Sequence, residues 1–218
     1  MFWRILPHAT ACVASDSLFV LDVRQDRYFR VPAAASSEML AWLDRNYSAV
    51  TPKAVIDTLI RARVLKEGDP EPTNVLKERV TIPAGLGRAD ASERGNGLPF
   101  RVAMSVASMR LSLRAFSLNH ILTGIFTRGP MLPRSNVQAA LAEAQAFERA
   151  RRMVPIARNC LLDSLALERW LARRGLGSQL VFGITPEPFA AHCWLQTPDV
   201  ILNDSFDHVS GFTPILAI

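Results

Sequence analysis

The stretch Arg158–Gly175, RNCLLDSLALERWLARRG, carries one of the three cysteines of the chain at the point where a helix is expected to begin. Asn159 is a favoured helix N-cap residue, which places Cys160 at the first helical position. The unpartnered backbone N–H groups and the helix dipole at such a position favour the thiolate form of a cysteine. From this stretch alone, Cys160 can be a small buried apolar side chain, a metal ligand or a nucleophile.

A nucleophilic cysteine needs a base within hydrogen-bonding distance, and the base needs an acceptor that orients it. His192 lies in the β-like run FAAHCWLQT, and Asp204 ends the next such run, VILND. Adjacent antiparallel strands can set a carboxylate beside an imidazole, and a helix packed on the same sheet can direct its first residue toward both. The sequence therefore predicts a site formed by Cys160, His192 and Asp204.

The other histidines and cysteines compete poorly for this role because they lie in an N-terminal segment, an apolar helix, an expected loop or a strand core. They are His8, His120, His208, Cys12 and Cys193. Cys193 should point away from the His192 side of its strand, since successive strand residues face opposite sides. A zinc site is the chemical rival, but no CxxC or HxxxH spacing occurs, and no metal is predicted.

Residues 1–80 predict a small N-terminal domain. The runs ATACVA, SLFVLDV and YFRV are short and β-like, and they predict a three-strand antiparallel meander. Two helices are expected to follow, in SSEMLAWLDRNY and in TPKAVIDTLIRARVLKEG, the second with Thr51 as N-cap and Pro52 at its first position. A stretch rich in Pro, Gly and charge comes next, which predicts a linker over residues 81–99 and a second domain over residues 100–218.

Residues 100–126 are expected to be helical, as one long helix or two, and residues 136–153 form a further helix. The apolar part, AFSLNHILTGIF (Ala115–Phe126), is shorter than the roughly 18 residues of a membrane span and has an arginine just outside each end. We expect it to be buried in the core, with a docking face for a partner as the alternative.

The composition limits the class of protein. Hydrophobic residues make up 49% of the chain, the formal net charge is +5, and three cysteines do not form a disulfide framework, so a reducing cytoplasm is expected. No run of Lys or Arg with interleaved aromatic residues supports nucleic-acid binding. No convincing signal peptide or apolar membrane segment occurs, so neither a membrane nor a nucleic acid is predicted as a partner.

The linked motifs CLLDSLALERWLARRG, LVFGI, PFAAHCW and LND resemble the lasso-peptide B proteins, the leader peptidases of lasso-peptide biosynthesis. The resemblance implies an α+β protein whose C-terminal domain is transglutaminase-like (papain-like), with helices packed on a short antiparallel sheet and a Cys160–His192–Asp204 triad. It implies a cysteine peptidase that hydrolyses the leader–core bond of a precursor peptide. An ATP-dependent, asparagine-synthetase-like cyclase would then close the macrolactam, so ATP is expected to enter only through that partner and no cofactor is expected on this chain.

The first domain is similar in outline to the RiPP recognition element, a winged-helix-like module of three strands followed by helices. The middle helix of that element is reduced here to RNYSAV. In the family the leader peptide adds as a strand beside the third strand and the last helix. The resemblance thus implies that the leader-binding residues are Tyr28, Phe29, Arg30, Val31, Leu59 and Arg63.

Two other functions remain compatible with the sequence. A transglutaminase-like acyltransferase would share the attack by Cys160 but pass the acyl group to an amine instead of water. A non-catalytic peptide-binding scaffold would use Cys160 only for packing. The product distinguishes the first from a peptidase, and the reactivity of the thiol distinguishes the second.

Overall fold

The computed structural model of the chain describes residues 3–31, 53–67, 80–85, 97–128 and 137–218. The chain divides into two compact units. The first consists of residues 1–80, 184–190 and 213–216, and the second of residues 81–183, 191–212 and 217–218. Both helices and sheets are present, so the chain has a mixed helix-and-sheet fold.

Several predicted features lie outside the described residues. They are the helix in SSEMLAWLDRNY, the RNYSAV segment, Thr51 and Pro52, and most of the predicted linker. The domain limits therefore stay a prediction.

The first unit contains the expected meander, which consists of β2 (Ala9–Ala14), β3 (Ser17–Asp22) and β4 (Arg27–Val31). The strands pair antiparallel in the order β2-β3-β4. The turn between β2 and β3 places Ser15 and Asp16 at φ values of 44° and 58°. Positive φ at both central residues is what a tight hairpin turn of the type I′ kind requires, because its twist matches that of the strands.

The helix α2 (Lys53–Arg61) accompanies this sheet, and a second, two-stranded sheet pairs β1 (Trp3–Ile5) with β5 (Leu65–Glu67) antiparallel. The sequence patterns did not predict β1, and they placed the residues of β5 in a helix that in the structure ends at Arg61. One apolar cluster joins the meander, α2 and β5, and its buried members are Ala9, Ala11, Leu18, Val20, Val31, Ile56, Leu59, Val64 and Leu65.

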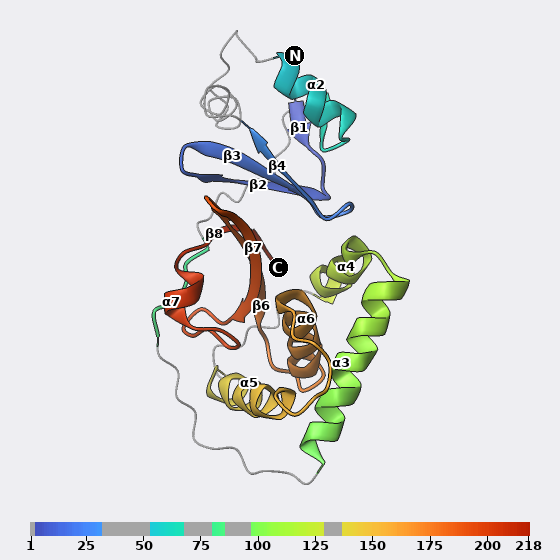
Figure 1. Ribbon diagram of the computed structural model, residues 1–218, viewed down its shortest axis with the longest axis vertical. Helices are drawn as coiled ribbons and strands as arrows, with labels where there is room; N and C mark the ends of the chain where they lie inside the picture. The colour runs from blue at the N-terminus through green and yellow to red at the C-terminus, as the bar shows by residue number, and fades with distance from the viewer. Residues whose placement is uncertain (1–2, 32–52, 68–79, 86–96, 129–136) are drawn as a thin grey trace. The chain divides into compact units, whose positions relative to one another are not determined.

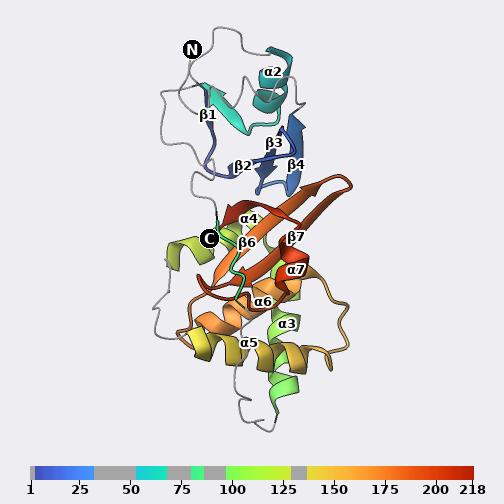
Figure 2. The ribbon, with the colours of Figure 1, turned by 90° about the vertical axis from the view of Figure 1, so that its left-hand side faces the viewer.

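The second unit begins with the helices α3 (Leu98–Ala115) and α4 (Leu118–Arg128). The helical pattern of residues 100–126 therefore forms two helices, because Phe116 leaves the helix with an extended backbone at φ −127° and ψ 149°. The helices α5 (Val137–Arg151) and α6 (Cys160–Ala172) follow. Figures 1 and 2 both show α6 beside the strands β6 and β7 and flanked by α3 and α5.

Buried contacts hold α6 in this central place. The Ser105 hydroxyl of α3 donates to the Ala166 carbonyl of α6 at 3.4 Å, and the Trp170 indole of α6 donates to Glu143 of α5 at 3.0 Å. Nine of the thirteen residues of α6 are buried, so nearly every side of this helix faces protein. A helix that is apolar on most sides is held in position by its neighbours.

A three-stranded sheet follows α6, formed by β6 (Gln179–Pro186), β7 (Phe189–Gln196) and β8 (Thr213–Ala217) in the order β7-β6-β8. The run VILND does not form the expected strand: Val200 and Ile201 make only isolated bridges. The hydroxyl of Thr197 accepts the backbone N–H of Val200 at 3.1 Å, which closes a turn directly before the run.

The apolar segment Ala115–Phe126 is not the core helix that we expected. Leu122 is buried, but Phe116 is 54% exposed and Phe126 is 73% exposed. Among the described residues, no helix has both the length and the apolar character needed to cross a membrane.

Candidate active site

Cys160 lies at the start of α6, as the sequence predicts. The side chain of Asn159 accepts the backbone N–H of Leu162 at 3.1 Å, which makes Asn159 the N-cap and Cys160 the first helical residue. Among the three cysteines, Cys160 is exposed, whereas Cys12 and Cys193 are buried. The thiol is therefore held by a capped helix and is open to solvent.

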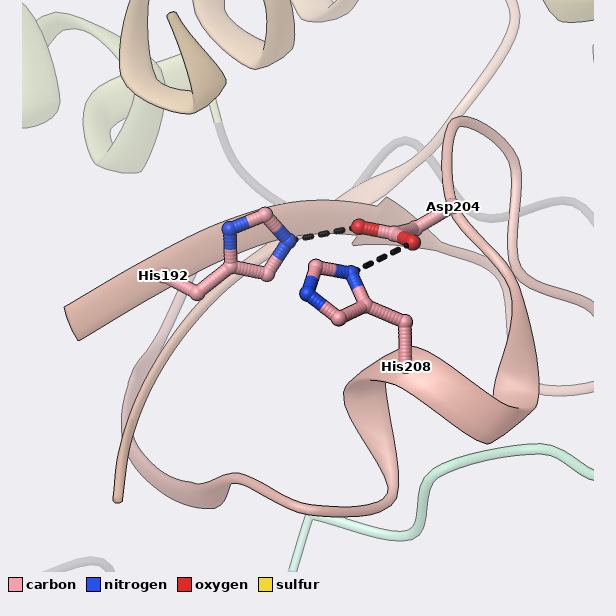
Figure 3. Close-up of side chains that lie close together, drawn as sticks. All are labelled: His192, Asp204 and His208. Atoms are coloured by element: carbon pink, nitrogen blue, oxygen red, sulfur yellow. Dashed lines mark hydrogen bonds and ion pairs between the residues drawn. The ribbon is translucent and has the colours of Figure 1, made fainter. Parts of the chain in front are cut away.

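His192 and Asp204 meet at this helix start. His192 lies in β7, and its Nε2 is 2.5 Å from Oδ2 of Asp204, which lies in the loop before the short helix α7 (Phe206–Val209). Figure 3 shows the other ring nitrogen of His192 directed away from this carboxylate. The Cys160 side chain forms a hydrogen bond with His192, so the structure brings together the three residues that the sequence singles out.

The surroundings of Cys160 stabilise its thiolate. Hydrogen bonds from the Cys193 side chain and then from His192, helped by the backbone of Cys193, outweigh the opposing effect of burial and lower the pKa of Cys160 to about 4. The position at the helix N-terminus acts in the same direction. Cys160 is therefore ionised over the physiological pH range.

The same contacts keep His192 protonated. Hydrogen bonds to Asp204 and then to Cys160 raise the pKa of His192 to about 9, although burial opposes them. Burial would raise the pKa of Asp204, but hydrogen bonds from His192, the Ser205 backbone and His208 lower it overall. Between about pH 4 and pH 9 the site thus holds a thiolate beside an imidazolium.

The three residues line one open cavity. Its volume is about 240 Å³, and its walls also include Arg158, Asn159 and Asn203. A charged nucleophile, an acid–base residue and an orienting carboxylate around a solvent-open cavity make up the constellation of nucleophilic acyl transfer.

A family model described as "Transglutaminase-like superfamily" matches residues 103–217, which is more than half of the chain. The chain belongs to the transglutaminase-like superfamily. The matched range includes α6, β7 and the loop with Asp204, so it contains the whole candidate site of this superfamily member.

One curated relative is the microcin J25-processing protein McjB of Escherichia coli. It is 36% identical to this chain over 47 residues, which is 22% of this chain and 23% of McjB, so the similarity spans about a quarter of that relative. No solved structure matches the chain. The superfamily match and the similarity to McjB together support a lasso-peptide B-protein-like assignment.

Asn203 and Ser164 hold the loop with Asp204 against the helix and the strand. The Asn203 side chain accepts the backbone N–H of Leu195 at 2.8 Å and donates to the Ser164 hydroxyl at 2.8 Å. The Ser164 hydroxyl in turn donates to the Cys193 carbonyl at 3.1 Å. Ser164 lies one helical turn after Cys160, so these bonds set α6, β7 and the acid loop at one fixed spacing.

Cys193 does not lie away from the site, as the alternation of strand residues led us to expect. It is 2% exposed and therefore belongs to the core, but its side chain and backbone both hydrogen-bond with Cys160. β7 is the outer strand in the order β7-β6-β8. The first residue of a helix packed at such an edge can contact two consecutive residues of the strand, one on each face. The alternation of strand residues along the sequence does not predict this contact.

A buried ion pair lies beneath the first turn of α6. The Nε of Arg151, which is 1% exposed, donates to Oδ1 of Asp163 at 2.8 Å, and the Nε of Arg158 donates to Oδ2 at 3.1 Å. Both oxygens of Asp163 are thus neutralised by guanidinium groups. The carboxylate nearest to Cys160 along the helix therefore adds little net negative charge to the site.

His208 belongs to the site, although the sequence predicts it in a loop outside the triad. Its Nδ1 lies 2.9 Å from Oδ1 of Asp204, on the oxygen that His192 does not use. The sequence does contain a signal for this contact. Ser205 caps α7 by accepting the backbone N–H of His208, and His208 follows Asp204 by four positions. Side chains four residues apart face each other across one helical turn.

Among the residues that the structure describes, His192, Asp204 and His208 also form a group that could hold a metal ion. Each offers one ligand atom, and these atoms lie within 4.8 Å of one another. The sequence predicts no metal site, and this group, which contains Asp204 and neither Cys160 nor Cys193, follows no CxxC or HxxxH spacing.

Of the six residues implied for leader binding, four lie on β4, Leu59 lies in α2, and Arg63 lies two positions beyond the end of α2, all in the first unit. Val31 and Leu59 are buried in the apolar cluster. The members that are exposed or half-buried are Tyr28, Phe29, Arg30 and Arg63. Phe29 also packs against the cluster, so β4 and α2 share one core.

Proposed function

We propose that this protein is a cysteine peptidase of lasso-peptide biosynthesis that binds a precursor peptide and hydrolyses its leader–core bond. The observation that carries the proposal is that Cys160, His192 and Asp204 line one open cavity, in which Asp204 holds Nε2 of His192. Membership in the transglutaminase-like superfamily and the similarity to the microcin J25-processing protein McjB support it.

The thiolate of Cys160 attacks the carbonyl carbon of the scissile bond. His192 enters the reaction as an imidazolium and gives its proton to the leaving amine, which becomes the free N-terminus of the core peptide. His192 is then neutral and takes a proton from water, and the resulting hydroxide attacks the thioester between leader and Cys160. The tetrahedral intermediate collapses, the leader departs with a new carboxyl group, and Cys160 leaves as the thiolate beside the imidazolium of His192, which restores the starting pair. Asp204 keeps the ring oriented throughout.

The oxyanion formed in both steps needs hydrogen-bond donors. The backbone N–H of Cys160 is one donor, because the first N–H groups of a helix have no intrahelical acceptor. It belongs to the same residue as the attacking sulfur, so it is close to the developing charge in every productive orientation of the substrate.

The first unit supplies the recognition of the leader in this proposal. It acts as the winged-helix-like RiPP recognition element of the chain, and the leader extends the sheet beside β4. Two observations support this: β4 stands last in the strand order β2-β3-β4, and it shares a core cluster with α2. In this arrangement Val31 and Leu59 hold β4 and α2 together through the apolar cluster, whereas Tyr28, Arg30 and Arg63 contact the leader.

The chemistry of the product implies a cyclase as the partner enzyme. Hydrolysis frees a core amine, and joining that amine to an acidic side chain requires activation of a carboxylate, which an ATP-dependent, asparagine-synthetase-like cyclase provides. ATP thus acts on the partner, and the chain itself needs no cofactor for the cleavage step.

The product of the reaction tests the proposal. The protein is incubated with a precursor peptide encoded beside its gene, in isotopically labelled water, and the products are weighed by mass spectrometry. We expect a free core peptide and a leader whose new C-terminal carboxylate carries one labelled oxygen. A leader joined to an added amine would instead support the acyltransferase, and an intact precursor under all conditions would contradict both enzymes.

A further inference from the structure

Asp204 carries a histidine on each of its two carboxylate oxygens. His192 approaches Oδ2 from β7, and His208 approaches Oδ1 from α7, so the two imidazoles converge on one carboxylate from different elements (Figure 3). The ring centroids of the two histidines are 4.7 Å apart. A triad needs only one of these rings, so the second histidine is unexplained by the proposed reaction.

The three side chains have the donor chemistry of a transition-metal site. Two imidazole nitrogens and one carboxylate oxygen are the ligands of many zinc sites, and here they lie within 4.8 Å of one another. The His208 side chain is 55% exposed, which gives an ion access from solvent and leaves room for water as a further ligand.

We propose that His192, Asp204 and His208 form an inhibitory binding site for a divalent ion of the zinc class. The ion would replace the two hydrogen bonds to Asp204 by coordination to Nε2 of His192, a carboxylate oxygen of Asp204 and Nδ1 of His208. Small movements of these side chains bring their ligand atoms from hydrogen-bonding distances to metal-binding distances.

Occupation of this site stops the acid–base work of His192. A coordinating imidazole is neutral, so binding of the ion releases the imidazolium proton and leaves Nδ1–H as the ring's one remaining proton. The remaining N–H is far less acidic than the imidazolium, so it is a poor proton donor for the leaving amine. The ring also has no free nitrogen that can accept a proton from water. Asp204 is also drawn away from its role of orienting the ring. This inhibitory consequence rests on the proposed function, whereas the binding of the ion does not.

Binding is measured first, on the Cys160→Ala variant, so that the thiol cannot contribute a ligand. Zinc is titrated into this full-length variant by calorimetry, and into the same variant carrying His208→Ala or His208→Gln. We expect a one-to-one complex that either substitution at His208 weakens by more than tenfold, because even the loss of an outer partner of a metal ligand costs about 10–100-fold in affinity. His120→Ala is the matched control, since His120 is an exposed histidine outside the cluster, and it should leave binding unchanged.

Circular dichroism of each variant shows that it is folded before the titration is interpreted. An affinity that is the same with and without His208 would overturn the site, as would the absence of binding at zinc concentrations of about 100 μM.

Inhibition is measured second, as leader removal by the protein with and without zinc and after addition of EDTA. We expect zinc to inhibit and EDTA to restore the activity, and the zinc concentration for half-inhibition should rise at least tenfold in His208→Gln when each protein is compared with its own zinc-free rate. Inhibition unaffected by this substitution would mean that zinc acts on Cys160 and would overturn the proposal. Binding at the site by a protein that cleaves no precursor would preserve the metal site and count against the proposed function alone.

Discussion

Cys160 and Cys12 have the same side chain in two regions that shift its pKa in opposite directions. Cys12 lies in β2 of the meander, is 7% exposed, and burial raises the pKa of its thiol to about 12. Cys160 starts a helix beside a histidine, and its hydrogen bonds lower the pKa of its thiol to about 4. The comparison shows that the structure around a cysteine, and not the residue type, determines whether its sulfur is a nucleophile.

The largest difference between the two regions is expected in activity. We predict that Cys160→Ala abolishes leader removal and that Cys12→Ala retains it, because Cys160 alone of the two supplies the attacking sulfur. Mass spectrometry of the precursor after incubation with each variant measures this. Equal cleavage by both variants would contradict the assignment of Cys160 as nucleophile.

The second difference is expected in the reactivity of the thiols. Cys160 should react with iodoacetamide down to about pH 4, in the presence of EDTA, because its thiolate persists until the pH falls through its pKa. Cys12 should stay unmodified in the folded protein, since it is buried and protonated below about pH 12. Peptide mapping of the alkylated protein at several pH values distinguishes the two. An unreactive Cys160 at mildly acidic pH would favour the non-catalytic scaffold.

The cleavage activity should depend on pH through the pKa values of Cys160 and His192. The rate falls as the pH drops through about 4, where the thiolate of Cys160 is protonated, and as it rises through about 9, where His192 loses the proton that it gives to the leaving amine. The pH profile of kcat/KM, measured with EDTA, reports both limits. In Asp204→Asn the upper limit should move to lower pH, because the hydrogen bond to Asp204 contributes most to raising the pKa of His192.

The two arginines that bind Asp163 beneath Cys160 should differ in how much each contributes to the stability of the fold. We predict that Arg151→Met destabilises the fold by about 3–5 kcal/mol, because it leaves the buried Asp163 without its main partner. Arg158→Met removes the other guanidinium, which is 51% exposed, and should cost about 0–1 kcal/mol. Urea unfolding curves of the two variants measure the difference, and comparable losses would mean that the buried pair is not the stronger support.

The smallest effect is expected at Gly183, in β6. A Cβ at this position would lie 2.9 Å from the Trp194 ring, which stacks beside His192 with ring centroids 6.1 Å apart. We expect Gly183→Ala to destabilise the fold by about 1–3 kcal/mol, as overpacking does, and to lower the cleavage rate by displacing the tryptophan. Gly124→Ala is the control, since nothing lies within 4 Å of a Cβ there. Equal stability of the two variants would show that Trp194 moves without cost.

Local sequence signals predicted the parts of the site that depend on neighbouring residues. The Asn159 cap and the helix start at Cys160 follow from residues within one turn, and the structure has both. The meander follows from its period of two, and the strands β6 and β7 from their β-like runs. These signals act through backbone hydrogen bonds and side-chain alternation over a few residues, so they can be read along the chain.

Local sequence signals do not predict contacts between segments that lie far apart in the chain. Pairing of β1 with β5 joins residues sixty or more positions apart, and neither strand is long enough to show a period. The exposure of Phe126, the bond of Cys193 to Cys160 and the place of His208 on Asp204 depend on which elements pack together.

The sequence by itself determined which residues could serve as nucleophile, base and acid, because residue type, helix capping and strand alternation are local properties of the chain. Only the tertiary structure decided that α6, β7 and the acid loop share one edge, that the pKa values of Cys160 and His192 shift toward the charged forms, and that a second histidine faces the acid. Such properties arise from distances between groups far apart in sequence, and the electrostatic interaction of two charges depends on their distance and on the surrounding dielectric.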